Sequence, residues 1–121
     1  MTDWHDVREE LRAFALSLPE THEDFPWGET VIKVNKKVFL FLGLDEPTEK
    51  WSPTFGVKLP ASHGHALTVE GAAPSGYGLG KAGWVTVPFM GELPETEVLI
   101  DWVEESYRTI APKRAIKLLD S

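Results

Sequence analysis

Lysine residues beside aromatic residues in the middle of the chain have the clearest chemical potential in this sequence. Lys37 directly precedes Val38-Phe39-Leu40-Phe41, part of a predicted strand that is apolar on both faces. Lysine neutralises phosphate groups, and an aromatic ring on a sheet stacks on a nucleic-acid base. The segment lacks the two glycines of an RNA-recognition strand, so it indicates only a general basic and aromatic surface.

A glycine-rich segment, Gly78-Leu79-Gly80-Lys81-Ala82-Gly83, matches the spacing G-x-G-x-x-G of dinucleotide-binding loops. Such a loop follows a strand and opens a helix, whereas here a loop precedes and a strand follows. A P-loop is also excluded, because Ser75 stands where its first glycine belongs and Ala82 follows the lysine. We therefore expect tight turns here, and an anion-binding loop of backbone amides with Lys81 remains an alternative.

No metal site is predicted from the histidine and acidic residues. His63 and His65 could share one side of the chain, but no third ligand stands at a suitable spacing, and cysteine is absent. An acidic stripe near the beginning of the chain suits the positive end of a helix dipole better than a cation. Its members are Asp3, Asp6, Glu9 and Glu10.

No catalytic constellation emerges either. The nucleophile motif G-x-S-x-G is absent, and the neighbouring carboxylates Glu104 and Glu105 point apart on a helix. Ser106 lies on the apolar stripe of that helix, so we expect its hydroxyl to meet the sheet, with a hydrogen bond to a ligand as the alternative. The sequence therefore predicts a protein that is not an enzyme and needs no cofactor.

The composition describes one small acidic domain. The chain has 121 residues, of which 42% are hydrophobic, a formal net charge of −7 and a pI near 5.0. This sign disfavours attraction of the whole molecule to nucleic acid or anionic lipid. The absence of cysteine fits a reducing compartment, and no apolar run approaches the roughly 20 residues that span a bilayer. We expect a cytoplasmic monomer, with one domain over residues 1–121 and no membrane contact.

The negative charge is concentrated at the two ends of the chain. Residues 1–24 carry −5 and residues 92–121 carry −3, whereas residues 25–91 carry +1. If the ends form helices and the middle forms a sheet, one layer is acidic and the other mildly basic.

Apolar periodicity predicts helices at both ends and strands between them. Thr21–Gly28 is interpreted as a fixed loop, and Asn35-Lys36 as a two-residue hairpin turn. The expected helices cover Asp3–Leu18, Ser62–Val69, Pro94–Ile110 and a basic tail from Lys113, and the expected strands cover Glu29–Val34, Lys37–Leu44, Thr54–Leu59 and Trp84–Phe89.

This order of elements predicts an α+β fold, in which an antiparallel β-sheet has the N- and C-terminal helices packed on one face. Simple alternation in the strand Lys37–Leu44 turns Val38, Leu40 and Leu42 toward the helices. It leaves Phe39 and Phe41 on the opposite face, which either is covered or serves as a binding platform.

Several segments together resemble the MmcQ/YjbR family over about residues 10–114. The segments are Phe25-Pro26-Trp27-Gly28, Lys33-Val34, Lys37-Val38-Phe39, Lys58-Leu59-Pro60, Leu79-Gly80-Lys81-Ala82-Gly83-Trp84-Val85, Ser106-Tyr107 and Ala111-Pro112-Lys113. The resemblance implies a CyaY-like two-layer sandwich. Members are commonly labelled DNA-binding, so it also implies that function.

The leading hypothesis is a binding protein that contacts DNA, weakly and with strong salt dependence, through the lysine-bearing sheet and loops. Its predicted contact residues are Lys33, Lys36, Lys37, Lys58, Lys81, Lys113 and Arg114. The alternative is a protective or regulatory protein that binds a small molecule in an aromatic pocket. That pocket would be lined by Trp27, Phe39, Trp84, Ser106 and Tyr107. A third reading, cation binding at the acidic stripe, rests only on the similarity of fold to frataxin-like proteins.

Overall fold

The computed structural model describes residues 4–43, 53–76, 79–90 and 92–121, without the side chain of Trp27. The helices are α1 (Trp4–Leu16), α2 (His63–Ala66), α3 (Thr96–Ile110) and α4 (Lys113–Asp120), with short 3-10 turns η1 (Pro26–Gly28) and η2 (Leu79–Ala82). The strands are β1 (Thr21–Asp24), β2 (Thr30–Val34), β3 (Lys37–Gly43), β4 (Thr54–Lys58), β5 (Ala73–Pro74) and β6 (Trp84–Pro88).

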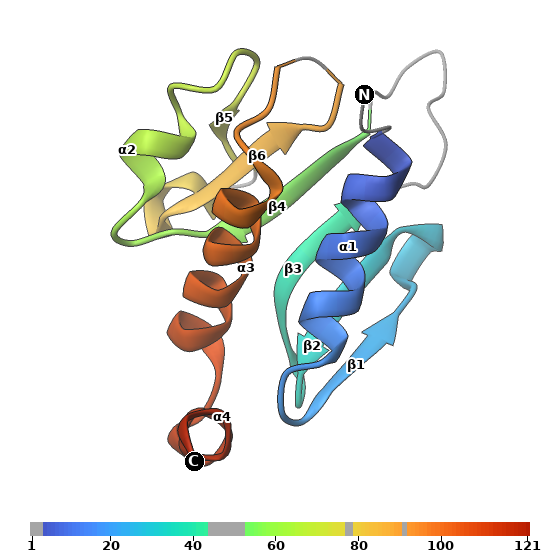
Figure 1. Ribbon diagram of the computed structural model, residues 1–121, viewed down its shortest axis with the longest axis vertical. Coiled ribbons are helices and arrows are strands. Elements are labelled where there is room, and N and C mark those ends of the chain that lie inside the picture. The colour runs from blue at the N-terminus through green and yellow to red at the C-terminus, as the bar shows by residue number, and fades with distance from the viewer. Residues whose placement is uncertain (1–3, 44–52, 77–78, 91) are drawn as a thin grey trace.

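The strands form one antiparallel sheet in the order β1-β2-β3-β4-β6-β5. Helices α1 and α3 lie side by side across one face of this sheet, and α4 follows at one end of the molecule (Figure 1). The predicted α+β fold, with terminal helices on one side of an antiparallel sheet, is confirmed.

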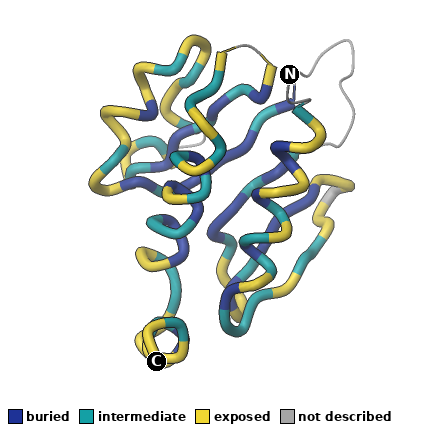
Figure 2. The backbone as a smooth tube through the Cα atoms, viewed as in Figure 1, coloured by how far each residue is buried: buried dark blue, intermediate teal, exposed yellow. Residues whose placement is uncertain are grey.

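The core fills the space between the helices and the sheet, where Figure 2 shows buried backbone on the inner side of both layers. Alternate strand residues such as Leu40, Leu42, Val57 and Val87 are fully buried there. The helices contribute their apolar stripes, which include Leu11, Ala15, Leu99 and Val103.

Phe39 faces the opposite way from the sequence prediction. Ile32 pairs with Leu40, and the next residue of β2, Lys33, pairs with Val38, so Phe39 has no partner and forms a β-bulge. Its ring lies against Tyr107 of α3, with centroids 5.2 Å apart, on the helix side of the sheet. Strict alternation is wrong here, because an extra residue in one strand reverses the side-chain direction at that point.

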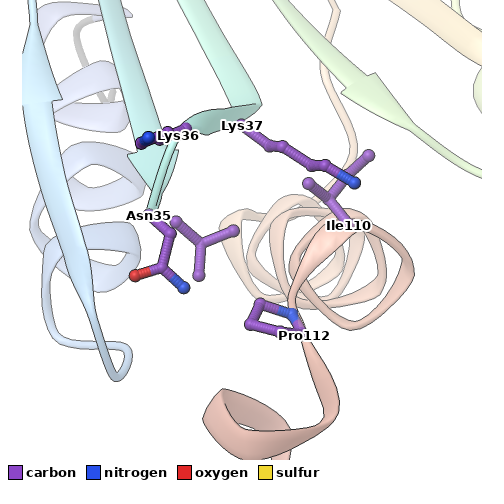
Figure 3. Close-up of a pocket in the computed structure, with 6 residues that line it drawn as sticks. Asn35, Lys36, Lys37, Ile110 and Pro112 are labelled. Carbon is purple, nitrogen blue, oxygen red and sulfur yellow. The ribbon is translucent and has the colours of Figure 1, made fainter.

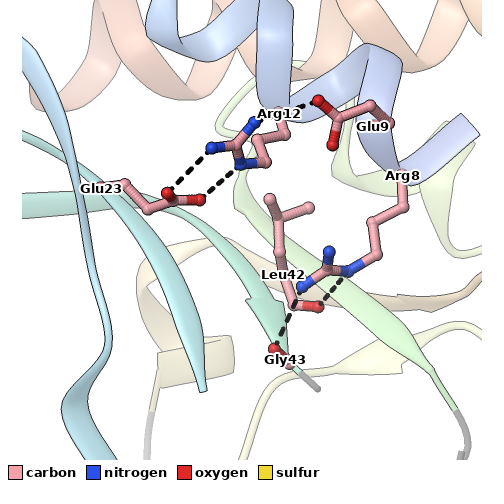
Figure 4. A network of polar contacts seen from close by, with 6 residues as sticks. All are labelled: Arg8, Glu9, Arg12, Glu23, Leu42 and Gly43. Atoms are coloured by element: carbon pink, nitrogen blue, oxygen red, sulfur yellow. Dashed lines mark hydrogen bonds and ion pairs between the residues drawn. The ribbon is translucent and has the colours of Figure 1, made fainter. Parts of the chain in front are cut away.

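Strand β1 occupies the first half of Thr21–Gly28, the segment predicted to be a fixed loop. Its polar residues have no apolar alternation, and the strand exists because β2 supplies a complete ladder from Thr21 opposite Val34 to Asp24 opposite Val31. Arg12 of α1 holds this edge strand by donating two hydrogen bonds to the carboxylate of Glu23, one of 2.9 Å (Figure 4). The same bonds hold the pKa of Glu23 below its usual range.

A second arginine of α1 reaches the end of β3. Arg8 donates from Nε to the carbonyl oxygen of Leu42 at 3.3 Å and from Nη2 to that of Gly43 at 3.4 Å (Figure 4). These carbonyls lie where β3 ends, so the buried guanidinium joins the first helix to the end of a central strand.

Several element boundaries differ from the predictions. Helix α1 ends at Leu16, and α3 begins at Thr96. The expected elements did not include β5 or η2, and the helix expected over Ser62–Val69 is limited to α2. The expected separation between the helix that ends at Ile110 and the tail from Lys113 is confirmed, since Pro112 lies between α3 and α4.

Candidate functional site

The sheet face turned away from α1 and α3, here called the open face, carries part of the predicted lysine set. Residues that pair directly across antiparallel strands share a face. One register row therefore crosses the whole sheet on this side: Asp24, Val31, Phe41, Gly56, Thr86 and Ala73.

Two lysines of the predicted set lie on the same face, because each stands two residues after a member of this row, Val31 or Gly56, in its own strand. Lys33 pairs with Val38, and Lys58 of β4 pairs with Trp84 of β6. Lys33 lies on β2 and Lys58 on β4, with β3 between them. Lys81 lies in η2, and Leu79 of η2 lines a pocket together with Phe41 and Thr86 of this face, so η2 borders the open face.

Lys33 is neutralised locally. Its ammonium donates to the carboxylate of Asp24 at 2.7 Å, and this bond, with the Phe25 amide, holds the pKa of Asp24 below its usual range. Lys58 and Lys81 have no ion pair within the described part of the chain. They are the two lysines of the open face whose charge is available to a ligand.

The remaining predicted bases lie around the β2–β3 turn and at the start of α4. Lys37 pairs with the buried Val34 and so belongs to the helix side of the sheet. Arg114 donates two hydrogen bonds to Glu20, so its charge is already paired. The structure therefore does not join Lys37, Lys113 and Arg114 to the open face.

Glu20 connects the α1–β1 turn, the β2–β3 turn and α4. It has a positive φ of 61° in the α1–β1 turn, its carbonyl accepts from the Asn35 amide at 3.1 Å, and its carboxylate pairs with Arg114. The bond to Arg114 lowers the pKa of Glu20.

A pocket of about 430 Å³ opens between the β2–β3 turn and the α3–α4 junction; we call it the hairpin pocket (Figure 3). It is lined by Val34, Asn35, Lys36, Lys37, Ile110 and Pro112. In Figure 3 the Lys37 side chain extends across the opening toward Ile110.

A smaller pocket of about 250 Å³ lies on the open face, and we call it the open-face pocket. Its lining includes Phe41, Gly56 and Thr86, which pair across β3, β4 and β6. Ser75 and Leu79, which follow β5 in the chain, also line it. The hydroxyl groups of Ser75 and Thr86 are 2.8 Å apart. The signal in the sequence was Gly56, a glycine inside an alternating strand that leaves room above its backbone.

The predicted aromatic pocket residues are divided between the two sides of the sheet. Phe39, Ser106 and Tyr107 are fully buried between the sheet and α3, whereas Trp84 contacts Phe41 on the other side, with ring centroids 5.2 Å apart. The side chain of Trp27 lies outside the described residues. These side chains therefore do not form one site.

Ser106 of α3 bridges β3 and β4 at the point where these two strands stop pairing. The ladder between β3 and β4 contains only Leu40 with Val57 and Phe41 with Gly56. Beyond it, the Ser106 hydroxyl donates to the Phe39 carbonyl oxygen and accepts from the Lys58 amide, at 2.5 and 2.9 Å. The Ser106 hydroxyl therefore contacts the sheet, as predicted. It bridges the two backbone groups where the next hydrogen bond between β3 and β4 would lie.

The glycine-rich loop has the geometry of tight turns. A Cβ on Gly80 would lie 2.7 Å from the Cβ of Pro74, and Gly83 has a φ of +95°, which favours glycine. Gly78 lies outside the described residues.

The histidine and acidic side chains do not assemble into a metal site within the described ranges, where no group of three suitable ligands occurs. His65 instead packs edge-on against Trp102, with ring centroids 5.4 Å apart, and Glu9 pairs with Arg12. Asp3 is not among the described residues.

Sheet, helices and pockets together define a small α+β protein with one helix-covered sheet face and one open face. No described helix has the length and hydropathy needed to cross a membrane. The YjbR family model matches residues 16–109, which is most of the chain, so the protein belongs to the YjbR family. No curated protein matches the sequence.

Proposed function

We propose that this protein binds nucleic acid, weakly and without catalysis, through the open face of its sheet. The observation that carries the proposal is the register, which brings Lys33 and Lys58 to one face beside the η2 segment with Lys81. Ammonium groups that replace the counterions of phosphates are the general source of such affinity.

The charge balance of this face limits the affinity. Asp24 neutralises Lys33, Glu29 adds a negative charge near the open-face pocket, and the whole chain carries −7. We therefore expect at most three phosphate contacts and a slope of about −2.7 in a plot of log affinity against log salt concentration. Contacts by the other bases of the predicted set would make this slope steeper.

The test is a fluorescence anisotropy titration of labelled duplex and single-stranded DNA at low salt. Replacing Lys58 and Lys81 together by Gln should weaken binding roughly tenfold and make the slope shallower by about 1.8, because two phosphate contacts are lost. Both side chains lie outside the core, so the variant should remain folded.

The matched control is Lys117→Gln in α4, an exposed lysine that is not on the open face. Lys58→Gln removes the same single charge and should weaken binding more than this control does. Absence of binding by the unmodified protein at low salt, or equal affinities for the double variant and the unmodified protein, would exclude the open face as a DNA surface.

A second candidate function, small-molecule binding, is supported by the open-face pocket. Gly56→Val should abolish binding of a planar aromatic ligand there, because the added side chain would occupy the pocket beside Phe41, whose nearest atoms lie 3.4 Å from a Cβ at this position. Valine also favours a strand over glycine, so stability should not fall.

The readout is chemical-shift mapping with a set of nucleosides and other planar aromatics. Shifts confined to Phe41, Gly56 and Thr86, and lost in Gly56→Val, would support this candidate. Unchanged spectra for the unmodified protein would count against it, whereas DNA binding tests the first proposal separately.

A further inference from the structure

We infer that the hairpin pocket is a binding site for a small amphipathic anion, a carboxylate attached to an apolar body of medium length. This inference is independent of the proposed nucleic-acid function, because the pocket lies on the helix side of the sheet. Its argument rests on the size of the pocket, its apolar walls and the charge at its opening.

The size and walls suit an apolar group. A volume of about 430 Å³ falls within the range of ligand pockets, about 300–1,000 Å³. Val34, which is 1% exposed, forms part of the wall from the sheet, and Ile110 and Pro112 form the wall from the helices. Pro112 has no backbone N–H, so it offers no hydrogen-bond donor to a ligand.

The opening of the pocket carries positive charge. Lys36 and Lys37 both line it, and neither has an ion pair within the described part of the chain. Figure 3 shows the Lys37 ammonium on the side of the opening nearest Ile110. Glu20, whose carbonyl accepts from the Asn35 amide, is paired through its carboxylate with Arg114, so it does not cancel the lysine charges.

The backbone fixes this arrangement before a ligand arrives. Asn35 adopts a φ of 56°, a left-handed conformation that asparagine tolerates better than most residues, and its amide is bonded to Glu20. The turn is thereby tied to the α1–β1 connection, and Arg114 ties α4 to the same glutamate. Both walls of the pocket are held in place, which reduces the entropy that a ligand must overcome.

One ammonium directed across an apolar pocket defines the ligand class. A neutral apolar molecule would leave the lysine charge unused, and a small anion such as acetate would leave the apolar walls in water. A carboxylate with a medium alkyl or aryl body satisfies both parts, because its charge meets Lys37 and its body covers Val34, Ile110 and Pro112.

The test uses the fluorescent anion 1-anilinonaphthalene-8-sulfonate, which emits strongly in apolar sites. Octanoate should displace this probe from the unmodified protein. Octanamide, which has the same length without the charge, should need about a tenfold higher concentration, and acetate should not displace the probe. Equal displacement by octanoate and octanamide would overturn the inference.

Variants localise the site. Lys37→Met keeps most of the side-chain length but removes the charge, and it should weaken octanoate binding about tenfold, whereas Lys37→Arg should restore it. The control Lys117→Met removes a lysine that does not line the pocket, and it should leave octanoate binding unchanged. Octanoate affinity that is identical in Lys37→Met and the unmodified protein would exclude this pocket.

The Lys58→Gln, Lys81→Gln double variant separates this inference from the nucleic-acid proposal. It should bind octanoate normally even though its DNA binding is impaired. Loss of octanoate binding in this variant would place the anion site on the open face and contradict the inference.

Discussion

Tyr107→Ala should lower the free energy of unfolding by about 4 kcal/mol, which is the largest effect of any substitution that we propose. Tyr107 is fully buried, and its ring packs edge-on against Phe39 in the bulge of β3. Removing the ring would leave a cavity between α3 and the sheet. For a chain of this length the melting temperature should fall by roughly 15 °C, as measured by circular dichroism or calorimetry.

Tyr107→Phe separates the ring from its hydroxyl. The hydroxyl donates to the Pro19 carbonyl oxygen at 2.8 Å, and burial raises the pKa of the phenol, so the group remains a donor at neutral pH. We expect a loss of about 1 kcal/mol for this variant. If Tyr107→Ala proved as stable as Tyr107→Phe, the ring would not be an essential part of the core.

Ser106→Ala should lower the free energy of unfolding by about 3 kcal/mol, although it removes only one oxygen atom. That oxygen bonds both the Phe39 carbonyl and the Lys58 amide, where β3 and β4 no longer pair. The substitution leaves a buried acceptor and a donor without their partner. Urea denaturation followed by tryptophan fluorescence measures the difference.

Thr109→Ala in the same helix is the matched control. Its hydroxyl also bonds a backbone carbonyl, that of Glu105, but it is exposed to solvent. Water replaces an exposed hydrogen bond, so this variant should change stability by less than about 0.5 kcal/mol. Equal effects at the two positions would show that the Ser106 bridge does not stabilise the sheet.

These two predictions bear on function, because Ser106 and Tyr107 belong to the sequence segments that resemble the YjbR family. In the structure both side chains are used by the fold: one bridges diverging strands, and the other fills the core and holds Pro19. Residues in segments that resemble a family can therefore have a structural role rather than contact a ligand. The candidate ligand contacts lie elsewhere, on Lys58 and Lys81 of the open face and on Lys37 of the hairpin pocket.

The charge distribution is the clearest case of a sequence inference that needed the fold. Partitioning the net charge predicted a mildly basic sheet region, but the residues 25–91 include lysines that point to different sides. Pairing of Lys33 with Asp24 and of Arg114 with Glu20 then removes two charges from the predicted surface. The paired residues are 9 and 94 positions apart in the chain, so a pattern among neighbouring residues does not predict either ion pair.

The fold class could be predicted from the sequence, because it depends on local periodicity. Apolar residues at helical spacing near Leu11 and Leu99, and alternating ones around Val57, are enough to predict helices packed on one face of a sheet. Which side chains contact one another became clear only from the folded molecule. The bulge turns Phe39 inward, β1 exists because β2 pairs with it, and the hairpin pocket forms where Val34 meets Ile110 and Pro112. Each of these depends on backbone pairing or packing between distant segments, and that is why the sites had to be read from the folded molecule.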